Sequence, residues 1–289
     1  MPIDDPAWLD RMYNNRALVP DHAAYFARWA ADSSSARTSM TCDLDVSYGP
    51  GTGETLDIFP AAVPDAPVLV FIHGGYWRSL DKSDHSFIAP AFVERGVCVV
   101  VLNYALCPGT PEAPVTIPHI TRQMARAAEW TAGHIASYGG DPSRITVAGH
   151  SAGGHLAAML MALDAAGPDA DVPASTFFRN ALSISGLYDL RPMQRAPFIA
   201  DSLRLTDGDV LRFSPALHAP PTRGMLYSVA GGDESAEFAR HNTMIRDAWG
   251  QEIVPVCELL PGLNHFGVVD ALARPGERLH RLALELLGA

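Results

Sequence analysis

The amino-acid sequence predicts one α/β domain over residues 1–289, with a mostly parallel eight-stranded sheet, helices on both faces and a small cap. Short apolar runs alternate with longer helical segments, which is the order that a parallel sheet requires. Two of these runs, 68–72 and 97–102, are continuously apolar, as in strands buried on both faces. No internal repeat or break in composition divides the chain, and α/β folds of this length often form one domain.

The strands are expected in chain order, separated by turns and helices. Their candidate ranges are 43–48, 55–59, 68–72, 97–102, 145–148, 182–185, 225–230 and 253–260. Helical spacing of apolar residues predicts a helix over 121–138. A run rich in Ala, Leu and Met predicts a second helix over 152–163, and an amphipathic pattern predicts a third over 277–287. The Gly-Gly-Asp-Pro segment at 139–142 is expected to be a turn.

Two segments lie outside this alternation. Residues 1–37 are expected to form a helical extension with a loop at 33–35. The sequence leaves open whether this extension packs over the site or tethers a partner subunit. The stretch 188–219 contains three prolines and has little strand character. It is therefore expected to form a cap inserted after the sixth strand.

The balance of charge restricts the partners of the chain. It has 21 basic and 32 acidic residues and a net charge of −11, whereas a nucleic-acid partner would require a basic surface. The acidity also disfavours anionic membrane surfaces, and no apolar run approaches the roughly 18 residues of a membrane span. The expected partner is a small-molecule substrate, and a homodimer is left open.

The N-terminal segment and the cysteines favour a cytoplasmic location. The first ten residues, MPIDDPAWLD, are acidic and lack the apolar core of a secretory signal. The four cysteines show no C-x-x-C spacing, so neither a zinc site nor a dithiol redox pair is predicted. We therefore expect a protein of the reduced cytoplasm that carries no metal and no cofactor.

The strongest chemical signal is the segment Gly149-His150-Ser151-Ala152-Gly153, which lies between a predicted strand and a predicted helix. A G-x-S-x-G at such a turn exposes the serine hydroxyl, because small residues on both sides let the backbone turn sharply. The N-terminal end of the following helix favours the negative charge that develops when the serine attacks a carbonyl. Ser151 is therefore the predicted nucleophile.

A second signal is His73-Gly74-Gly75-Tyr76-Trp77, which directly follows the apolar strand at 68–72. In this position, glycines let a substrate carbonyl approach the main-chain N–H groups. We expect the amides of Gly74, Gly75 and Ala152 to form an oxyanion hole. The His73 side chain is expected to hold the loop and not to act as a base.

The predicted base is His265, in a loop between the last strand and the C-terminal helix. Asp233 and Glu234 follow the strand at 225–230, which gives the chain order serine, acid, histidine. Either carboxylate could accept the Nδ1 proton of the imidazole and stabilise the imidazolium.

The other histidines are expected to be surface, packing or loop residues. His150 and His155 flank the predicted nucleophile in sequence. Their side chains are expected to face along the turn and the helix.

Together these segments resemble the arylformamidase, or kynurenine formamidase, family of α/β hydrolases. The resemblance rests on HGGYW, GHSAGGHLAAML, ISGLYDL, the pair Ser214-Pro215, ESAEFARHN and NHF, and it covers most of the chain. It implies the α/β-hydrolase fold and a Ser-His-acid triad. In the family the acid precedes a Ser-x-Glu-Phe segment, and Glu234 holds that place here. The resemblance therefore favours Glu234 over Asp233, although animal members have aspartate there.

The resemblance also implies a substrate, N-formyl-L-kynurenine, which would be cleaved to kynurenine and formate. An aryl-amine leaving group would require aromatic walls. The expected walls are Tyr76, Trp77 and Phe266, together with Tyr188 and Phe198 of the cap.

The sequence also suggests three alternative functions. A carboxylesterase, or a hydrolase of another small amide or carbamate, would use the same residues. A non-catalytic ligand-binding relative is disfavoured because all three triad candidates are present. A metal-dependent formamidase is disfavoured because no H-x-x-x-H or H-x-H grouping stands out at suitable positions.

Overall fold

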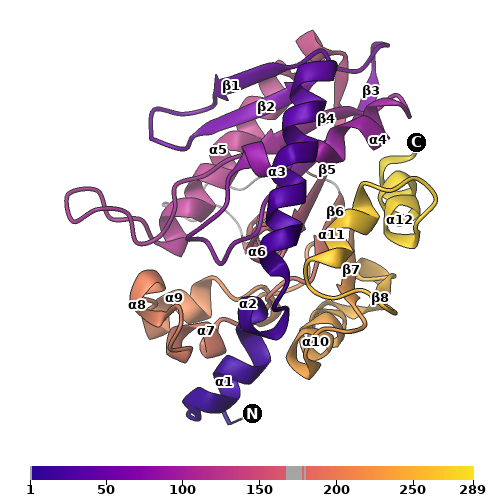
Figure 1. The fold of residues 1–289 in the computed structure, drawn as a ribbon. Helices are drawn as coiled ribbons and strands as arrows, with labels where there is room; N and C mark the ends of the chain where they lie inside the picture. The colour runs from indigo at the N-terminus through magenta and orange to yellow at the C-terminus, as the bar shows by residue number, and fades with distance from the viewer. Residues whose placement is uncertain (1, 167–177, 179) are drawn as a thin grey trace.

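The computed structural model describes residues 2–166, 178 and 180–289 and contains one eight-stranded sheet (Figure 1). The strands lie in the order β1-β2-β4-β3-β5-β6-β7-β8. β2 is antiparallel to both of its neighbours, and the pairs from β4 to β8 are parallel. The strands are Asp43–Ser47, Thr55–Phe59, Ala66–Ile72, Cys98–Leu102, Gly140–His150, Asn180–Ile184, Met225–Gly231 and Cys257–Leu260. The predicted mostly parallel eight-stranded sheet is confirmed.

Alternate residues of the central strand β3 enter two hydrophobic clusters, one on each face of the sheet. Val68, Val70 and Ile72 belong to one cluster, and Leu69 and Phe71 belong to the other. Successive side chains of a strand point to opposite faces. Because both faces of β3 are covered, its sequence is apolar throughout.

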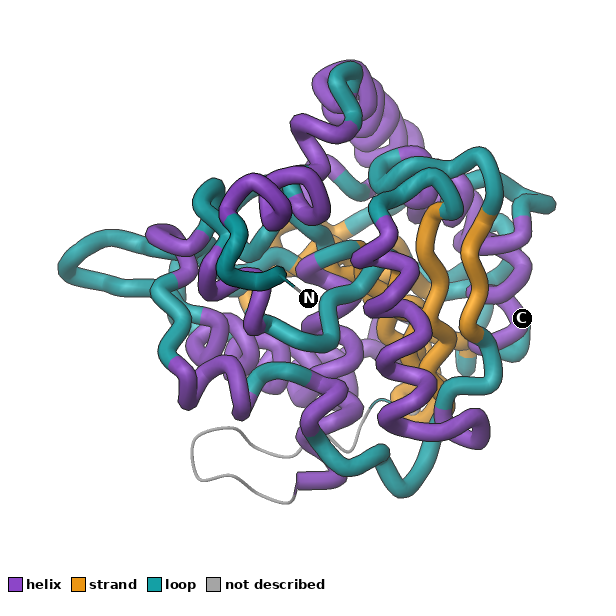
Figure 2. The backbone as a smooth tube through the Cα atoms, turned by 90° about the horizontal axis from the view of Figure 1, so that it is seen from below, coloured by secondary structure: helices purple, strands orange, loops and turns teal. Residues whose placement is uncertain are grey.

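Helices cover both faces, and in the view from below they surround the central strands (Figure 2). On the Val70 face lie α5 (Ile117–His134), α6 (Ala152–Ala166) and α10 (Ala236–Ile253). On the Phe71 face lie α3 (His22–Ser39), α4 (Ala89–Val93), α11 (Gly267–Leu272) and α12 (Arg278–Leu287). The 3₁₀ helices η1–η4 span Lys82–Asp84, Ser86–Ile88, Ile135–Tyr138 and Pro215–Leu217. Within the described ranges, no helix has the length and hydrophobicity of a membrane span.

The N-terminal helices lie beside the insertion between β6 and β7, at the lower end of the molecule in Figure 1. They are α1 (Pro6–Tyr13) and α2 (Asn15–Leu18). The insertion, predicted as a cap over 188–219, forms α7 (Arg191–Arg195), α8 (Ala200–Leu203) and α9 (Asp207–Arg212). Helix α1 contacts both α7 and α10. The N-terminal extension therefore lies next to the cap segment.

Three predicted elements were wrong in detail. Residues 33–35 lie within α3 and not in a loop, because Ser33 is buried and its Oγ accepts the N–H of Phe87. Strand β5 begins at Gly140, where the sequence suggested a turn, because Gly140 pairs with Ala66. Strand β8 begins at Cys257 and not at 253, because α10 extends to Ile253. In the first two cases, contacts with distant residues outweighed local turn and loop signals.

Candidate active site

The candidate residues gather at the carboxyl ends of the parallel strands. Gly74 and Gly75 follow β3, Ser151 follows β5, Glu234 follows β7 and His265 follows β8. Parallel strands present their carboxyl ends along one edge of the sheet, which is where open α/β folds bind ligands. Residues that are far apart in the sequence are thereby brought to one edge.

Ser151 lies on a sharp turn between β5 and α6. Its φ is 56°, in the left-handed region, and its N–H donates to the carbonyl of Ile184 at 2.8 Å. A Cβ on Gly149 would lie 2.1 Å from the Gly153 oxygen, and one on Gly153 would lie 2.0 Å from the Ile72 oxygen. Both positions therefore require glycine. The strained turn presents the serine side chain at the edge of the sheet.

His265 is paired with Glu234. The Nδ1 of His265 lies 2.6 Å from Oε2 of Glu234, and the two side chains are only 5% and 1% exposed. The other carboxylate oxygen of Glu234 accepts the N–H of Gly231 at 2.6 Å and the hydroxyl of Ser185 at 2.5 Å. These donors orient the carboxylate toward the imidazole. Because Nδ1 faces the acid, Nε2 is the nitrogen free to exchange a proton with a reacting group.

Asp233, the other predicted acid, is exposed and does not contact His265. Its Oδ1 accepts the N–H of Gly262 at 3.3 Å. Adjacent side chains leave the backbone in different directions, and here only Glu234 faces the histidine. The structure therefore distinguishes the two carboxylates that the sequence pattern alone left open.

Ser151 and His265 line one cavity of about 170 Å³. This volume lies below the roughly 300–1,000 Å³ of pockets for drug-sized ligands. No hydrogen bond joins the Ser151 hydroxyl to any other residue in the described part of the chain. Hydrogen bonds between a nucleophile and its base are often loose in a site without substrate. The cavity suits a small substrate that reaches both side chains.

His150 lies at the cavity, contrary to the prediction that it faces along the turn. Its Nε2–H donates to the carbonyl of His265 at 2.8 Å, and the two rings are 4.6 Å apart. Burial and the neighbouring His265 lower the pKa of His150 well below its usual range, so the ring is neutral. His150 therefore positions the loop that carries His265.

The amides predicted for an oxyanion hole lie next to Ser151 in space. A Cβ on Gly74 would lie 3.2 Å from the Ser151 Cβ, and Gly75 lines the cavity. Gly75 has a φ of +103°, which favours glycine. No residue in the described ranges accepts a hydrogen bond from the N–H groups of Gly74, Gly75 and Ala152. These amides are available to a substrate oxygen.

The loop of these amides is held by His73 and Tyr104. The ring nitrogens of His73 lie 2.8 Å from the Gly74 oxygen and 3.0 Å from Oδ1 of Asn103. The Tyr104 hydroxyl donates to the carbonyls of His73 and Gly74. His73 thus occupies the loop-holding position expected from the sequence.

Only some of the predicted aromatic walls reach the cavity. Tyr76, Phe198 and Phe266 line it. Trp77 does not, which corrects the prediction: it is buried and packs edge-on against the His155 ring at 5.0 Å. Tyr76 and Trp77 are neighbours in sequence, and only the former faces the cavity.

Tyr188 also lies away from the cavity. Its ring is buried, and its hydroxyl contacts Ser228 Oγ at 2.8 Å. Its main-chain N–H donates to Nδ1 of His241 at 3.0 Å. Tyr188 belongs to the core beneath the cap segment.

The structure places the N-terminal extension at the site, which is one of the two positions that the sequence left open. Its cavity-lining residues are Asn14, Asn15, Arg16, Phe26 and Trp29. The aromatic residues of this segment were visible in the sequence. Nothing in their local pattern indicated that they lie over the carboxyl ends of the strands.

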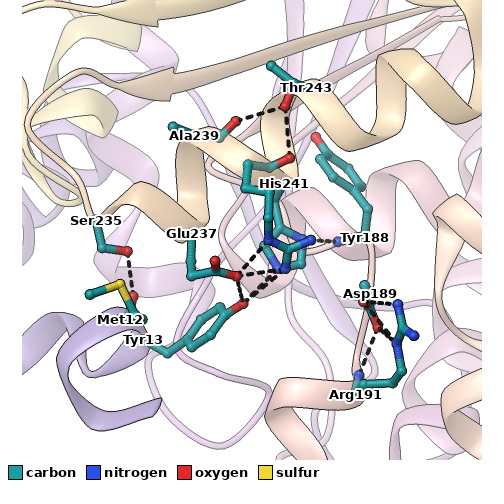
Figure 3. Close-up of polar contacts among 11 residues, drawn as sticks. Met12, Tyr13, Tyr188, Asp189, Arg191, Ser235, Glu237, Ala239, His241 and Thr243 are labelled. Atoms are coloured by element: carbon teal, nitrogen blue, oxygen red, sulfur yellow. Dashed lines mark hydrogen bonds and ion pairs between the residues drawn. The ribbon is translucent and has the colours of Figure 1, made fainter. Parts of the chain in front are cut away.

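Polar contacts attach this segment to α10, directly after the acid (Figure 3). The Tyr13 hydroxyl donates to Oε2 of Glu237 at 2.7 Å and lies 3.2 Å from Nε2 of His241. The hydroxyl of Ser235 donates to the carbonyl of Met12. The segment ESAEFARHN, which carries part of the family resemblance, therefore holds α1 against the site.

Within residues 2–166 and 180–289, no group of three or more histidine, cysteine, aspartate or glutamate side chains is arranged to hold a metal ion.

Proteins with similar sequences are hydrolases. Residues 56–195 match the family model BD-FAE. The chain is 28% identical to the kynurenine formamidase of Salmo salar over 85% of this chain and 82% of that protein. It is 38% identical to esterase LipQ of Mycobacterium tuberculosis over 50% of this chain and 35% of that protein.

A solved structure with a similar fold supports the same conclusion. The crystal structure of a candidate thioesterase from a Silicibacter species is 31% identical to this chain, with a TM-score of 0.79. The match covers 96% of this chain and 97% of the other. The relatives identify a serine-type hydrolase that acts on amide or ester bonds. The chain is an α/β hydrolase that is similar to the kynurenine formamidases over most of its length.

Proposed function

We propose that this hydrolase cleaves N-formyl-L-kynurenine to kynurenine and formate, with Ser151, His265 and Glu234 as its catalytic triad. The observation that carries the proposal is the buried Glu234–His265 pair, whose imidazole lines the same small cavity as Ser151. The formamidase relatives support the choice of substrate.

In the first half of the reaction, Ser151 Oγ attacks the formyl carbon while Nε2 of His265 takes its proton. The amides of Gly74, Gly75 and Ala152 bind the oxyanion of the tetrahedral intermediate. Glu234 holds the imidazole through Nδ1 and stabilises its protonated form. His265 then protonates the leaving aryl amine, the C–N bond breaks, and a formyl ester remains on Ser151.

In the second half, water replaces the amine. His265 takes a proton from the water, whose oxygen attacks the formyl carbon. The second tetrahedral intermediate collapses, the C–O bond to Ser151 breaks, and the serine recovers its proton from His265. The products are formate and the free enzyme.

The cavity walls support an aromatic leaving group. Tyr76, Phe198 and Phe266 line the space beside Ser151. A formyl group is the smallest acyl group, so most of the cavity of about 170 Å³ is left for the amine portion. Aromatic side chains that line a cavity stabilise a bound aromatic ring through offset-stacked or edge-to-face contacts.

The test compares N-formylkynurenine with p-nitrophenyl acetate in steady-state assays of the wild type and Ser151→Ala. We expect efficient formamide turnover, and a kcat lowered roughly 10⁴- to 10⁶-fold in the variant. Circular dichroism and thermal unfolding of Ser151→Ala serve as the folding control.

Two outcomes would change the proposal. A formamide rate far below the ester rate would favour a carboxylesterase, for which the esterase relative is the supporting observation. A fluorophosphonate that fails to label Ser151 in the wild type would indicate a non-catalytic binding protein.

A further inference from the structure

Two arginines line the cavity that contains Ser151, and none of the described residues that line it is an aspartate or glutamate. Arg78 follows the HGGYW segment and is half-buried, whereas Arg16 comes from the N-terminal extension and is exposed. The chain as a whole has a net charge of −11. The cavity is therefore cationic in an acidic protein.

The hydrogen bonds of these side chains go to neutral hydroxyls. Arg16 Nη2 donates to Ser79 Oγ at 2.9 Å, and Arg78 Nη1 donates to Ser202 Oγ at 3.3 Å. No carboxylate in the described ranges forms an ion pair with either guanidinium. Partial burial and the charge of Arg78 lower the pKa of Arg16. The two cations therefore repel each other without an anion to compensate them.

Other arginines of the chain bind carboxylates directly. Arg191 lies 2.6 Å from Oδ2 of Asp189, and Arg278 lies 2.6 Å from Oε1 of Glu258. Acidic residues thus supply partners to arginines elsewhere in the molecule. No acidic residue in the described ranges lines this cavity or pairs with Arg16 or Arg78, which leaves both guanidiniums available to a ligand.

Arg16 is linked through Ser79 to the loop that carries Gly75, one of the expected oxyanion-hole residues. Ser79, which accepts from Arg16, donates through its hydroxyl to the carbonyl of Gly75 at 3.0 Å. The Arg16 guanidinium also lies 5.5 Å from the centre of the Phe26 ring. Ser151 is buried, whereas Arg16 is exposed. An anion on Arg16 would therefore lie toward solvent from the acyl group, on the leaving-group side.

We propose that Arg16 and Arg78 form a carboxylate-binding subsite, which makes the enzyme selective for substrates whose aromatic leaving group carries a carboxylate. The inference rests on the proposed function, in which Ser151 attacks an acyl group at the inner end of the cavity. Guanidinium groups bind carboxylates through paired, charge-assisted hydrogen bonds. The subsite would orient the leaving group while the aromatic walls hold its ring.

The test compares N-formylkynurenine with N-formylkynuramine, which lacks only the carboxylate. For the wild type we expect a KM for the kynuramine that is roughly 10- to 100-fold higher, as for loss of a charge-assisted hydrogen bond. Arg78→Gln and Arg16→Gln should each reduce this ratio toward one. Arg11→Gln, which removes an exposed charge outside this cavity, should leave the ratio unchanged.

A second measurement separates this inference from the formamidase assignment. Anthranilate and its neutral isostere 2-aminobenzamide would be compared as competitive inhibitors of p-nitrophenyl acetate hydrolysis. Tighter inhibition by anthranilate, lost in Arg78→Gln but not in Arg11→Gln, supports the subsite even if N-formylkynurenine is not cleaved. Equal inhibition by both compounds, or a KM ratio that the arginine variants do not change, overturns the subsite even if the formamide is cleaved.

Discussion

Glu234, which faces His265, differs from its neighbour Asp233 in its burial and in the hydrogen bonds that it accepts. Glu234 receives hydrogen bonds from Gly231 and Ser185 and is oriented before any substrate binds. Asp233, one residue earlier, is exposed and accepts one long hydrogen bond. At the scale of single residues, these two carboxylates form a matched pair for testing the acid.

Glu234→Gln is expected to lower kcat roughly 10³- to 10⁴-fold, because an amide does not stabilise the imidazolium and can favour the wrong tautomer. Asp233→Asn, the same change at the adjacent position, should leave kcat within about twofold of the wild type. Steady-state kinetics on N-formylkynurenine would measure both. Equal losses in the two variants would contradict the assignment of Glu234.

At the scale of elements, the turn between β5 and α6 depends on close backbone approach. A Cβ on Gly153 would lie 2.0 Å from a main-chain oxygen of β3, which cannot move without disturbing the sheet. We expect Gly153→Ala to lower the free energy of unfolding by about 1–3 kcal/mol or more. Urea denaturation with a circular dichroism readout would measure it.

Gly133→Ala provides the matched control for this substitution. A Cβ on Gly133, near the end of α5, would meet no atom within 4 Å. Because alanine favours the helix, this variant should be stabilised by roughly 0.5–1 kcal/mol. If Gly153→Ala were as stable as the wild type, the turn would not require the close approach described above.

The attachment of α1 to α10 is a second property at this scale. Tyr13→Phe removes the hydroxyl between Glu237 and His241, both of which are buried. Leaving these groups without that partner should cost about 1–3 kcal/mol of unfolding free energy. Chemical denaturation would measure the loss.

The same substitution at Tyr227 is the control. The Tyr227 hydroxyl donates at 2.9 Å to Glu285, an exposed residue that water can solvate. Tyr227→Phe should therefore cost less than about 1 kcal/mol. A larger loss at Tyr227 than at Tyr13 would mean that the α1–α10 contacts contribute little to stability.

At the scale of the whole molecule, buried histidines make stability depend on pH. Burial lowers the pKa of His155 to about 4 and that of His85 and His241 to about 3. In the unfolded chain a histidine titrates near 6.5. Between these values the unfolded chain binds protons that the folded chain excludes. The contribution of these histidines to the free energy of unfolding is therefore fully present above pH 6.5. It is lost as the pH falls below this value.

We expect the free energy of unfolding to decrease between pH 7 and pH 5, as followed by urea denaturation. His155 contributes a slope of up to about 1.4 kcal/mol per pH unit in this window. His155→Gln should therefore show a shallower dependence than the wild type. His134→Gln, the same substitution at an exposed position, is the control and should keep the wild-type slope. Identical slopes for all three proteins would contradict the argument.

The order of strands and helices could be predicted from the sequence, because it depends on local apolar patterns. The turn at Ser151 and the glycines after β3 could be predicted for the same reason, since each needs particular residues at consecutive positions. The resemblance to a known family favoured Glu234. In each case the information lies within a short stretch of chain.

Only the tertiary structure decided which side chains share the site. In the structure Glu234 pairs with His265. Trp77 is buried in the core, whereas Tyr76 lines the cavity. Residues 14–16 of the N-terminal extension line the same cavity as Ser151. These placements depend on packing between segments that lie tens to hundreds of residues apart. Local periodicity carries no signal for such contacts, because it records which face of an element is apolar and not which distant segment covers it.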